Sequence, residues 1–135
     1  MSIGSDASAV SLADAGGMLH PRTFGTFPRV IAEYVKKRGV ITIEDAIRKM
    51  TSLPAARMRL FDRGVIREGL KADVTIFDYN QISDTATYEN AASLPTGIDY
   101  VLVNGQIVVD QGRHTGAKPG AVLRGAGYQA TSSHE

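Results

Sequence analysis

A carboxylate close to the start of the chain is the first residue whose position suggests chemistry. Asp6 follows a short apolar stretch and Gly4-Ser5, where the sequence predicts the end of a strand. In β/α proteins a carboxylate placed there faces the loop end of the strands, which is where sites are built. Aspartate is also common where a chain simply turns after a strand, and local sequence alone favours this plainer interpretation of Asp6.

An arginine that follows a small-residue loop is the second residue with a chemical interpretation. Residues 7–19 are rich in Ala, Ser and Gly and predict a long loop, which leads into His20-Pro21-Arg22. The planar guanidinium of Arg22 carries a fork of N–H donors that suits two-point recognition of a carboxylate. Without other information, an exposed arginine before a helix and a surface histidine remain the commoner interpretations.

Other polar clusters give weaker signals. The glycine-rich segment 114–120 contains His114 and Lys118, but no strand–GxxxxGK[ST]–helix pattern surrounds it, so a loop is favoured over a phosphate cradle. Cysteine is absent, which excludes disulfides, thiolate zinc sites and cysteine nucleophiles. The three histidines are too scattered for a self-contained metal site. The residues alone therefore assemble no catalytic triad, carboxylate pair or metal cluster.

Helices are predicted in the first half of the chain, directly after these residues. Thr26 is the expected cap of a first helix, with Pro28 in its first turn and Gly39 as its stop. Thr42 is the expected cap of a second helix, because an acidic residue follows three positions later. The break at residues 52–54 opens a short third helix.

Strands are predicted in the second half. The clearest local pattern is a hairpin with a type I′ turn at Asn104-Gly105, where both central residues need a positive φ. Helices followed by strands indicate an α+β fold. The predicted strands, in chain order, are residues 65–66, 72–78, 100–103, 106–109 and 121–123.

Length and charge limit the classes of protein that are possible. With 135 residues the chain is about one domain, and it is too short for a complete (β/α)8 barrel of about 250 residues. Its 15 basic and 14 acidic residues are intermixed, so neither nucleic acid nor an anionic membrane is an expected partner. No apolar run approaches a membrane span, and the start lacks the pattern of a signal peptide.

Several motifs together resemble a known family. They are Gly4-Ser5-Asp6, HPRTFGTFPR at 20–29, DRGVIREG at 62–69, GIDYVLVNG at 97–105 and HTGAKPG at 114–120. The chain resembles, from about residue 3 to 127, the C-terminal part of the N-acyl-D-amino-acid deacylases, the D-aminoacylase branch of the amidohydrolase superfamily.

The resemblance implies a fold that combines a metal-bearing (β/α)8 barrel with a small β-sandwich domain. Residues 1–61 would be the C-terminal end of the barrel, with its last strand at residues 1–5, followed by a loop and helices. Residues 62–127 would be part of the small β-domain, and residues 128–135 a disordered tail. The expected fold class is thus an α+β fragment of such an enzyme.

The resemblance also implies an activity, namely zinc-dependent hydrolysis of the C–N bond of N-acyl-D-amino acids to a D-amino acid and a carboxylate. Asp6 would accept a proton from the metal-bound water, deliver it to the leaving amine, and contact the weaker metal site. Arg22 would pair with the α-carboxylate of the substrate and so fix its orientation.

The sequence departs from that family in what it lacks. The family's metal ligands are a His-x-His after the first strand, a bridging cysteine and two later histidines, and none of them is present. We therefore expect zinc only in the full-length enzyme, and no cofactor and no activity in this chain alone. We also expect a cytoplasmic location and self-association through unpaired strand edges. The alternative is a free-standing, non-catalytic α+β module that binds or scaffolds.

Overall fold

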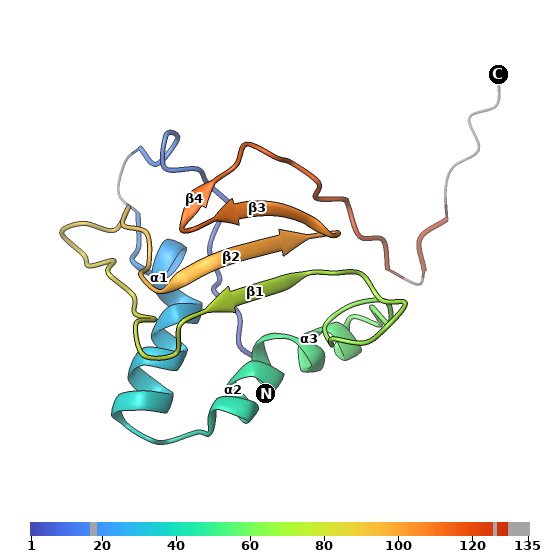
Figure 1. The fold of residues 1–135 in the computed structure, drawn as a ribbon, viewed down its shortest axis with the longest axis horizontal. Helices are drawn as coiled ribbons and strands as arrows, with labels where there is room; N and C mark the ends of the chain where they lie inside the picture. Colours follow the sequence, from blue (N-terminus) through green and yellow to red (C-terminus); the bar gives the residue numbers. More distant parts are fainter. Residues whose placement is uncertain (17–18, 126, 130–135) are drawn as a thin grey trace.

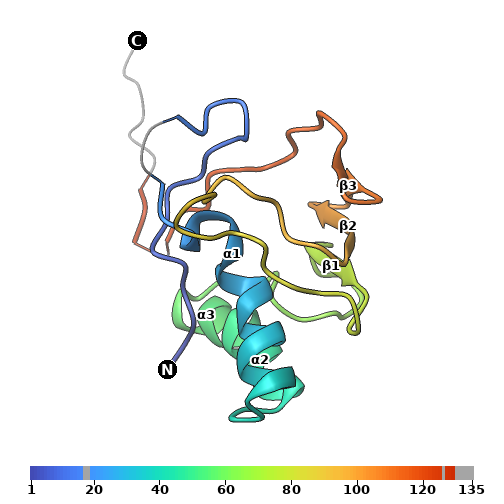
Figure 2. The ribbon, with the colours of Figure 1, turned by 90° about the vertical axis from the view of Figure 1, so that its left-hand side faces the viewer.

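A group of helices and a four-stranded antiparallel sheet form the part of the chain that a computed structural model describes, residues 1–16, 19–125 and 127–129 (Figure 1). The helices all precede the strands in the sequence. Figure 2 shows the helices and the sheet side by side, with the long connection between β1 and β2 running over α1. The α+β class predicted from the order of the elements is confirmed in these residues.

The first helix begins earlier than predicted. α1 spans Arg22–Arg29 and continues without a break into a π-helical segment, η1, at Val30–Lys37. Thr26 is therefore not the cap but an interior residue, and its hydroxyl donates to the carbonyl of Arg22 at 2.9 Å. Pro28 lies inside the helix, where it has no N–H to donate, and the hydrogen-bond register widens two residues later.

The predicted helix stop and the second helix cap are both confirmed. Gly39 has a φ of 59°, and the N–H of Val40 donates to the carbonyl of Tyr34 at 3.0 Å, which closes the end of η1. The hydroxyl of Thr42 accepts the N–H of Asp45 at 3.2 Å. The next helices are α2 at Ile43–Met50 and α3 at Ser52–Arg57.

The sheet is built around the predicted hairpin. Its order is β1-β2-β3-β4, and each neighbouring pair is antiparallel. Asn104 and Gly105 have φ angles of 48° and 81°, as a type I′ turn requires, and Val103 pairs with Gln106 across it. The strands are Val74–Phe77 (β1), Ile98–Val103 (β2), Gln106–Asp110 (β3) and Arg113–His114 (β4).

Three predicted strands are wrong. Residues 1–5, expected to be the last barrel strand, form no strand, and neither do residues 65–66 or 121–123. A strand needs a neighbour for its backbone hydrogen bonds, and in the described residues these segments have none along a sheet. The N–H of Ile3 donates instead to the carbonyl of Lys49 at the end of α2, at 3.0 Å.

The buried core lies between the helices and the connection at residues 78–97, and not beneath the sheet. Ile31 in η1 and Ile82 in the connection are each 3% exposed. None of the described residues buried to this degree belongs to a strand, and the helices and strands hardly pack against each other. The helices therefore bury apolar side chains against the connection and hardly at all against the strands.

Among the described residues, none of the helices combines the length and the hydrophobicity that a membrane-spanning segment needs. The predicted disordered tail at 128–135 falls, from residue 130 onward, outside the described residues.

Candidate active site

The two residues singled out from the sequence contact each other. A guanidinium nitrogen of Arg22, Nη1, lies 3.1 Å from Oδ2 of Asp6, and the two side chains are 46% and 89% exposed. The backbone of Asp6 has a φ of 51°, in the left-handed region that aspartate tolerates better than most residues. The chain thus turns sharply at Asp6, and its carboxylate meets the guanidinium at the start of α1.

The start of α1 is capped by the histidine that precedes it. The amide N–H of Arg22 donates to Nδ1 of His20 at 3.1 Å, and the N–H of Thr23 donates to the His20 carbonyl at 3.0 Å. His20 thereby satisfies N–H groups that have no partner within the helix. A neutral imidazole has one donor and one acceptor nitrogen, so in the neutral ring an acceptor role for Nδ1 places the proton on Nε2.

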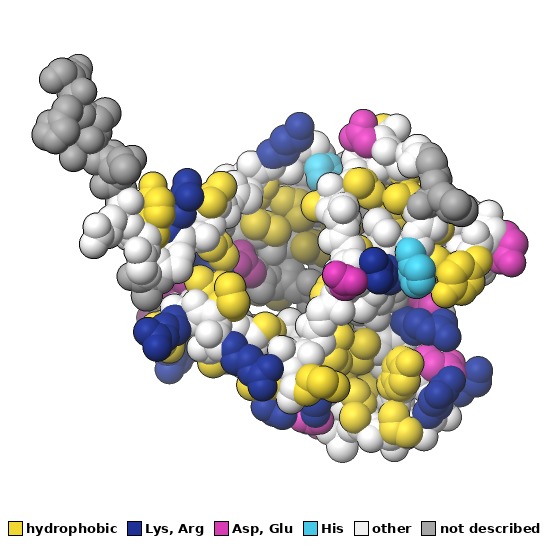
Figure 3. Space-filling model, turned by 180° about the vertical axis from the view of Figure 1, so that it is seen from behind, with side chains coloured by type: hydrophobic (Ala, Val, Ile, Leu, Met, Phe, Trp, Pro, Cys, Tyr) yellow, Lys and Arg dark blue, Asp and Glu magenta, His cyan; other side chains and the backbone are white. Residues whose placement is uncertain are grey.

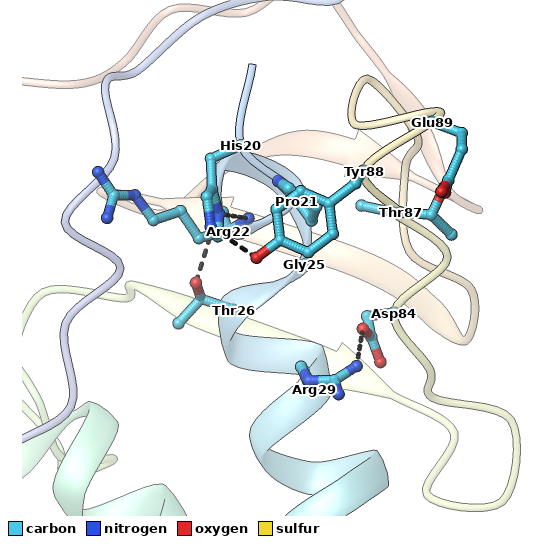
Figure 4. A pocket seen from close by; sticks show the side chains of 11 residues that line it. His20, Pro21, Arg22, Gly25, Thr26, Arg29, Asp84, Thr87, Tyr88 and Glu89 are labelled. Carbon is cyan, nitrogen blue, oxygen red and sulfur yellow. Dashed lines mark hydrogen bonds and ion pairs between the residues drawn. The ribbon is translucent and has the colours of Figure 1, made fainter. Parts of the chain in front are cut away.

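The other ring nitrogen of His20 faces an aromatic residue from a distant part of the chain. The hydroxyl of Tyr88 lies 3.2 Å from Nε2, and the two rings meet edge to face at 5.2 Å between centroids (Figure 4). Because Nδ1 is occupied as an acceptor, Nε2–H donates to the Tyr88 oxygen. Figure 4 shows the Arg22 side chain extending away from Tyr88, so the pair braces the helix from the side opposite the guanidinium.

A cavity of about 410 Å³ lies between the first turns of α1 and the connection at residues 84–89. Arg29 of α1 closes one side of it, with Nη1 2.9 Å from Oδ2 of Asp84, whose side chain is only 12% exposed. The hydrogen bond and charge of Asp84 raise the pKa of Arg29 above its ordinary value. Gly25 permits the close approach, since a Cβ there would lie 3.3 Å from the Asp84 Cβ.

Sequence reasoning missed the residues of the connection. Tyr88 and Asp84 lie in a polar segment with no motif. Their partners, His20 just before α1 and Arg29 within it, are 68 and 55 residues away along the chain. The length of the connection between β1 and β2 was the one available signal, because long loops in compact domains are often functional. The segment 114–120 contributes no residue to the cavity lining; its Pro119 carbonyl accepts from the Asn104 side chain at 2.8 Å.

Comparison with known proteins places this geometry in a family. The model of the amidohydrolase family matches residues 1–109. The chain belongs to the amidohydrolase family. The sequence-based resemblance to the deacylase branch is confirmed by relatives from Alcaligenes xylosoxydans xylosoxydans: a D-aminoacylase, 43% identical over 104 residues, and an N-acyl-D-glutamate deacylase, 42% identical over 105 residues.

Solved amidohydrolase structures agree with these sequence matches. The chain is similar to a crystal structure of D-aminoacylase, with a TM-score of 0.71 and 41% identity over 73% of this chain. It is also similar to N-acyl-D-glutamate deacylase from Bordetella bronchiseptica in complex with zinc and a phosphonate inhibitor, with a TM-score of 0.65 and 42% identity over 66% of this chain. The chain spans about a fifth of the length of these relatives: 22% of the D-aminoacylase and 21% of the N-acyl-D-glutamate deacylase sequence, and 21% and 19% of the two solved chains.

The contact between Asp6 and Arg22 contributes a single carboxylate to a possible metal site. Across residues 1–16, 19–125 and 127–129, no group of three or more His, Cys, Asp or Glu side chains is arranged to hold a metal ion. Asp6 fits as a single oxygen ligand, because its carboxylate is exposed and only one of its oxygens contacts Arg22. A catalytic zinc site typically needs three protein ligands, so at least two more would have to come from elsewhere.

A second hollow lies on the other side of the helices. It measures about 700 Å³ and lies between α2 and β1, with Ile47, Val65 and Phe77 among its apolar lining residues. Figure 3 shows hydrophobic side chains exposed over much of the rear face of the molecule, around a deep hollow. Extensive exposed apolar surface of this kind marks sites where another segment or protein packs.

Proposed function

We propose that this chain is the part of a zinc-dependent N-acyl-D-amino-acid deacylase that supplies a proton-transferring carboxylate, Asp6, and a substrate-binding guanidinium, Arg22. The observation that carries the proposal is the 3.1 Å contact between these two side chains in a chain 42% to 44% identical to three deacylases of D-amino acids. Acid–base chemistry and carboxylate recognition at one place are what hydrolysis of an N-acyl amino acid requires.

The proton balance of the reaction defines the role of Asp6. Water adds to the amide carbonyl and the C–N bond breaks, so one proton must leave the water and one must reach the amine nitrogen. An exposed carboxylate can accept the first proton on an oxygen and return it to the amine, as a general base and then a general acid. The Asp6 side chain, 89% exposed, has the required access to solvent.

Recognition of the substrate defines the role of Arg22. The α-carboxylate of an N-acyl amino acid is planar, and a guanidinium binds it at two points. An exposed ion pair stabilises a protein by only about 0–1 kcal/mol, so exchanging the contact with Asp6 for one with a substrate costs little. In an N-acyl amino acid the amide nitrogen and the carboxylate are attached to the same carbon. A substrate whose carboxylate is bound by Arg22 therefore has its amide close to Asp6, which lies beside Arg22.

The zinc of the proposed enzyme would take Asp6 as one ligand among others that this chain does not supply. When bound, zinc would polarise the amide carbonyl of the substrate and lower the pKa of a coordinated water to about 7. We further propose that residues 1–61 close the catalytic barrel and residues 62–127 form part of the small β-domain. This assignment rests on the family match and on the division between helices and sheet, and it implies that the isolated chain is inactive.

A hybrid enzyme tests the proposal. Residues 1–109 of this chain replace the matching segment of the Alcaligenes D-aminoacylase, and release of the D-amino acid from an N-acetyl-D-amino acid is measured with and without zinc. We expect zinc-dependent hydrolysis, a kcat lower by about 100-fold or more in Asp6→Asn, and a raised KM in Arg22→Lys.

The control is Asp99→Asn, an exposed carboxylate in β2 that should leave both constants unchanged. Full activity in a folded Asp6→Asn hybrid would contradict the assigned role. A folded hybrid that binds zinc but hydrolyses nothing would instead favour a non-catalytic α+β module.

A further inference from the structure

The first turn of α1 is fixed by one histidine that uses both ring nitrogens. Nδ1 of His20 accepts the backbone N–H of Arg22 at 3.1 Å, and Nε2 lies 3.2 Å from the hydroxyl of Tyr88. The residue held by this arrangement is the one whose guanidinium contacts Asp6. The backbone of Arg22 and its side chain therefore have separate partners, and the side chain extends away from Tyr88 (Figure 4).

Arg22 needs such support because of where it lies. It is the first residue of α1, and the preceding Pro21 makes no side-chain cap hydrogen bond. Helix ends fray when their N–H groups lack partners. A long, flexible arginine side chain amplifies any movement of its backbone, and a misplacement of about 1 Å can cost about 100-fold in rate.

Tyr88 supplies the second constraint. In a histidine, the hydrogen bond made by one nitrogen decides which nitrogen carries the proton. By accepting from Nε2–H, the Tyr88 hydroxyl keeps Nδ1 unprotonated, which is the state that can accept the N–H of Arg22.

Burial does not account for this contact. Tyr88 is 77% exposed and His20 is also exposed, so packing into a core contributes little to holding them together. The segment that carries Tyr88 is already held against α1 by Arg29 and Asp84 at 2.9 Å. The contact between His20 and Tyr88 is thus not required to hold the connection against α1. Its distinct contribution is to fix the start of α1.

We propose that His20 and Tyr88 are positioning residues that fix the start of α1 and so direct the Arg22 guanidinium toward the substrate's carboxylate. This inference rests on the role given to Arg22 under the proposed function. It makes Tyr88, in the β1–β2 connection and far from Arg22 along the chain, a determinant of carboxylate affinity. Tyr88 acts through His20 and does not itself touch the substrate.

The protonation pattern is tested on the 135-residue chain by long-range ¹H–¹⁵N NMR of the His20 ring at a pH where the ring is neutral. We expect one tautomer, with the proton on Nε2, in the native chain. In Tyr88→Phe, which keeps the ring but removes the hydroxyl, we expect a mixture of tautomers. Tyr100→Phe, in β2, is the matched control and should leave the His20 signals unchanged. A native chain with the proton on Nδ1, or an unaltered pattern in Tyr88→Phe, would overturn the inference.

The effect on the substrate is tested in the hybrid enzyme described above. For Tyr88→Phe and His20→Ala we expect a KM raised about 10-fold with kcat within about twofold, because ground-state and transition-state binding of the carboxylate fall together. His20→Asn retains an oxygen that can accept the Arg22 N–H and should restore much of the loss. Tyr100→Phe is again the control.

The outcomes separate this inference from the function on which it rests. If Arg22→Lys leaves KM unchanged, the role of Arg22 itself is wrong. If Arg22→Lys raises KM while His20→Ala and Tyr88→Phe do not, only the positioning pair is wrong. A lower thermal stability in His20→Ala with unchanged KM would show a purely structural contact and would also overturn it.

Discussion

At the scale of single residues, the candidate site depends on close approaches that few side chains permit. Asp6 occupies the left-handed backbone region, where its short polar side chain is tolerated. Gly25 lies in the interior of α1, and its lack of a side chain lets the connection pass against the helix. Both residues therefore matter for the path of the backbone, and Asp6 also supplies a carboxylate.

Enlarging Gly25 should separate the connection from α1. A branched side chain would press on the Cβ atoms of Asp84 and Ala86, which lie 3.3 and 3.6 Å from the position of a Cβ at residue 25. We expect Gly25→Val to lower the free energy of unfolding by about 1–3 kcal/mol, measured by urea denaturation. The control is Gly120→Val, where no atom lies within 4 Å of the added Cβ. An equal free energy of unfolding of the two variants would show that the connection can move away from α1 without loss of stability.

At the scale of elements, α2 is stabilised at its start by both a cap and charge. The Thr42 hydroxyl accepts the N–H of Asp45, and the Asp45 carboxylate accepts from Lys49 and Arg48. These hydrogen bonds, the one from Lys49 first, lower the pKa of Asp45 below its ordinary value. A carboxylate in the first turn is also favoured by the helix dipole.

The stability contributed by Asp45 should depend on pH in a defined direction. Since its pKa is lower in the folded chain, its contribution is fully present above the unfolded value of about 3.9 and is lost as the pH falls through the folded value. We expect Asp45→Asn to be less stable than the native chain at pH 7 and equally stable at the acid end of the range. The measurement is urea unfolding followed by circular dichroism between pH 7 and pH 2.5. A difference that persists undiminished at the lowest pH would rule out this ionisation as its cause.

In the molecule as a whole, the sheet holds none of the well-buried side chains of the described residues. The well-buried side chains are in the helices and the connection, while Ile76 in β1 and Ile107 in β3 are exposed. β1 pairs only with β2, so its outer edge has no strand beside it in the described residues. A sheet normally buries one face, and an open edge is a template for another strand.

We therefore expect the isolated chain to self-associate through the edge of β1 and the hollow beside it. Light scattering after size-exclusion chromatography should give a mass above that of the 14.4 kDa chain. Ile76→Lys, which puts a charge on β1, should shift the chain toward the monomer. Gln106→Lys, which adds the same charge on β3, is the control. A native chain that elutes as a sharp monomer would contradict the expectation.

Local signals in the sequence predicted the turn and two of the helix ends correctly, but not the start of the first helix or three of the strands. Asn104-Gly105 specifies a type I′ turn because both residues tolerate a positive φ, and Thr42 and Gly39 mark helix ends through their own backbone and side-chain properties. Thr26 failed as a cap because a better acceptor, His20, lies upstream and starts the helix earlier. The predicted strands at 1–5, 65–66 and 121–123 failed because β-propensity alone supplies no partner.

The α+β class, the hairpin, the end of the first helix, the cap of the second and, through the motifs, the amidohydrolase family were thus predictable from the sequence. These properties depend on residues near one another along the chain. The contacts of Asp6 with Arg22 and of Tyr88 with His20 appear only in the folded chain. Such contacts depend on how the helices and the long connection pack against each other. The free energy of this packing is shared among residues that lie far apart along the chain, so it leaves no local pattern in the sequence.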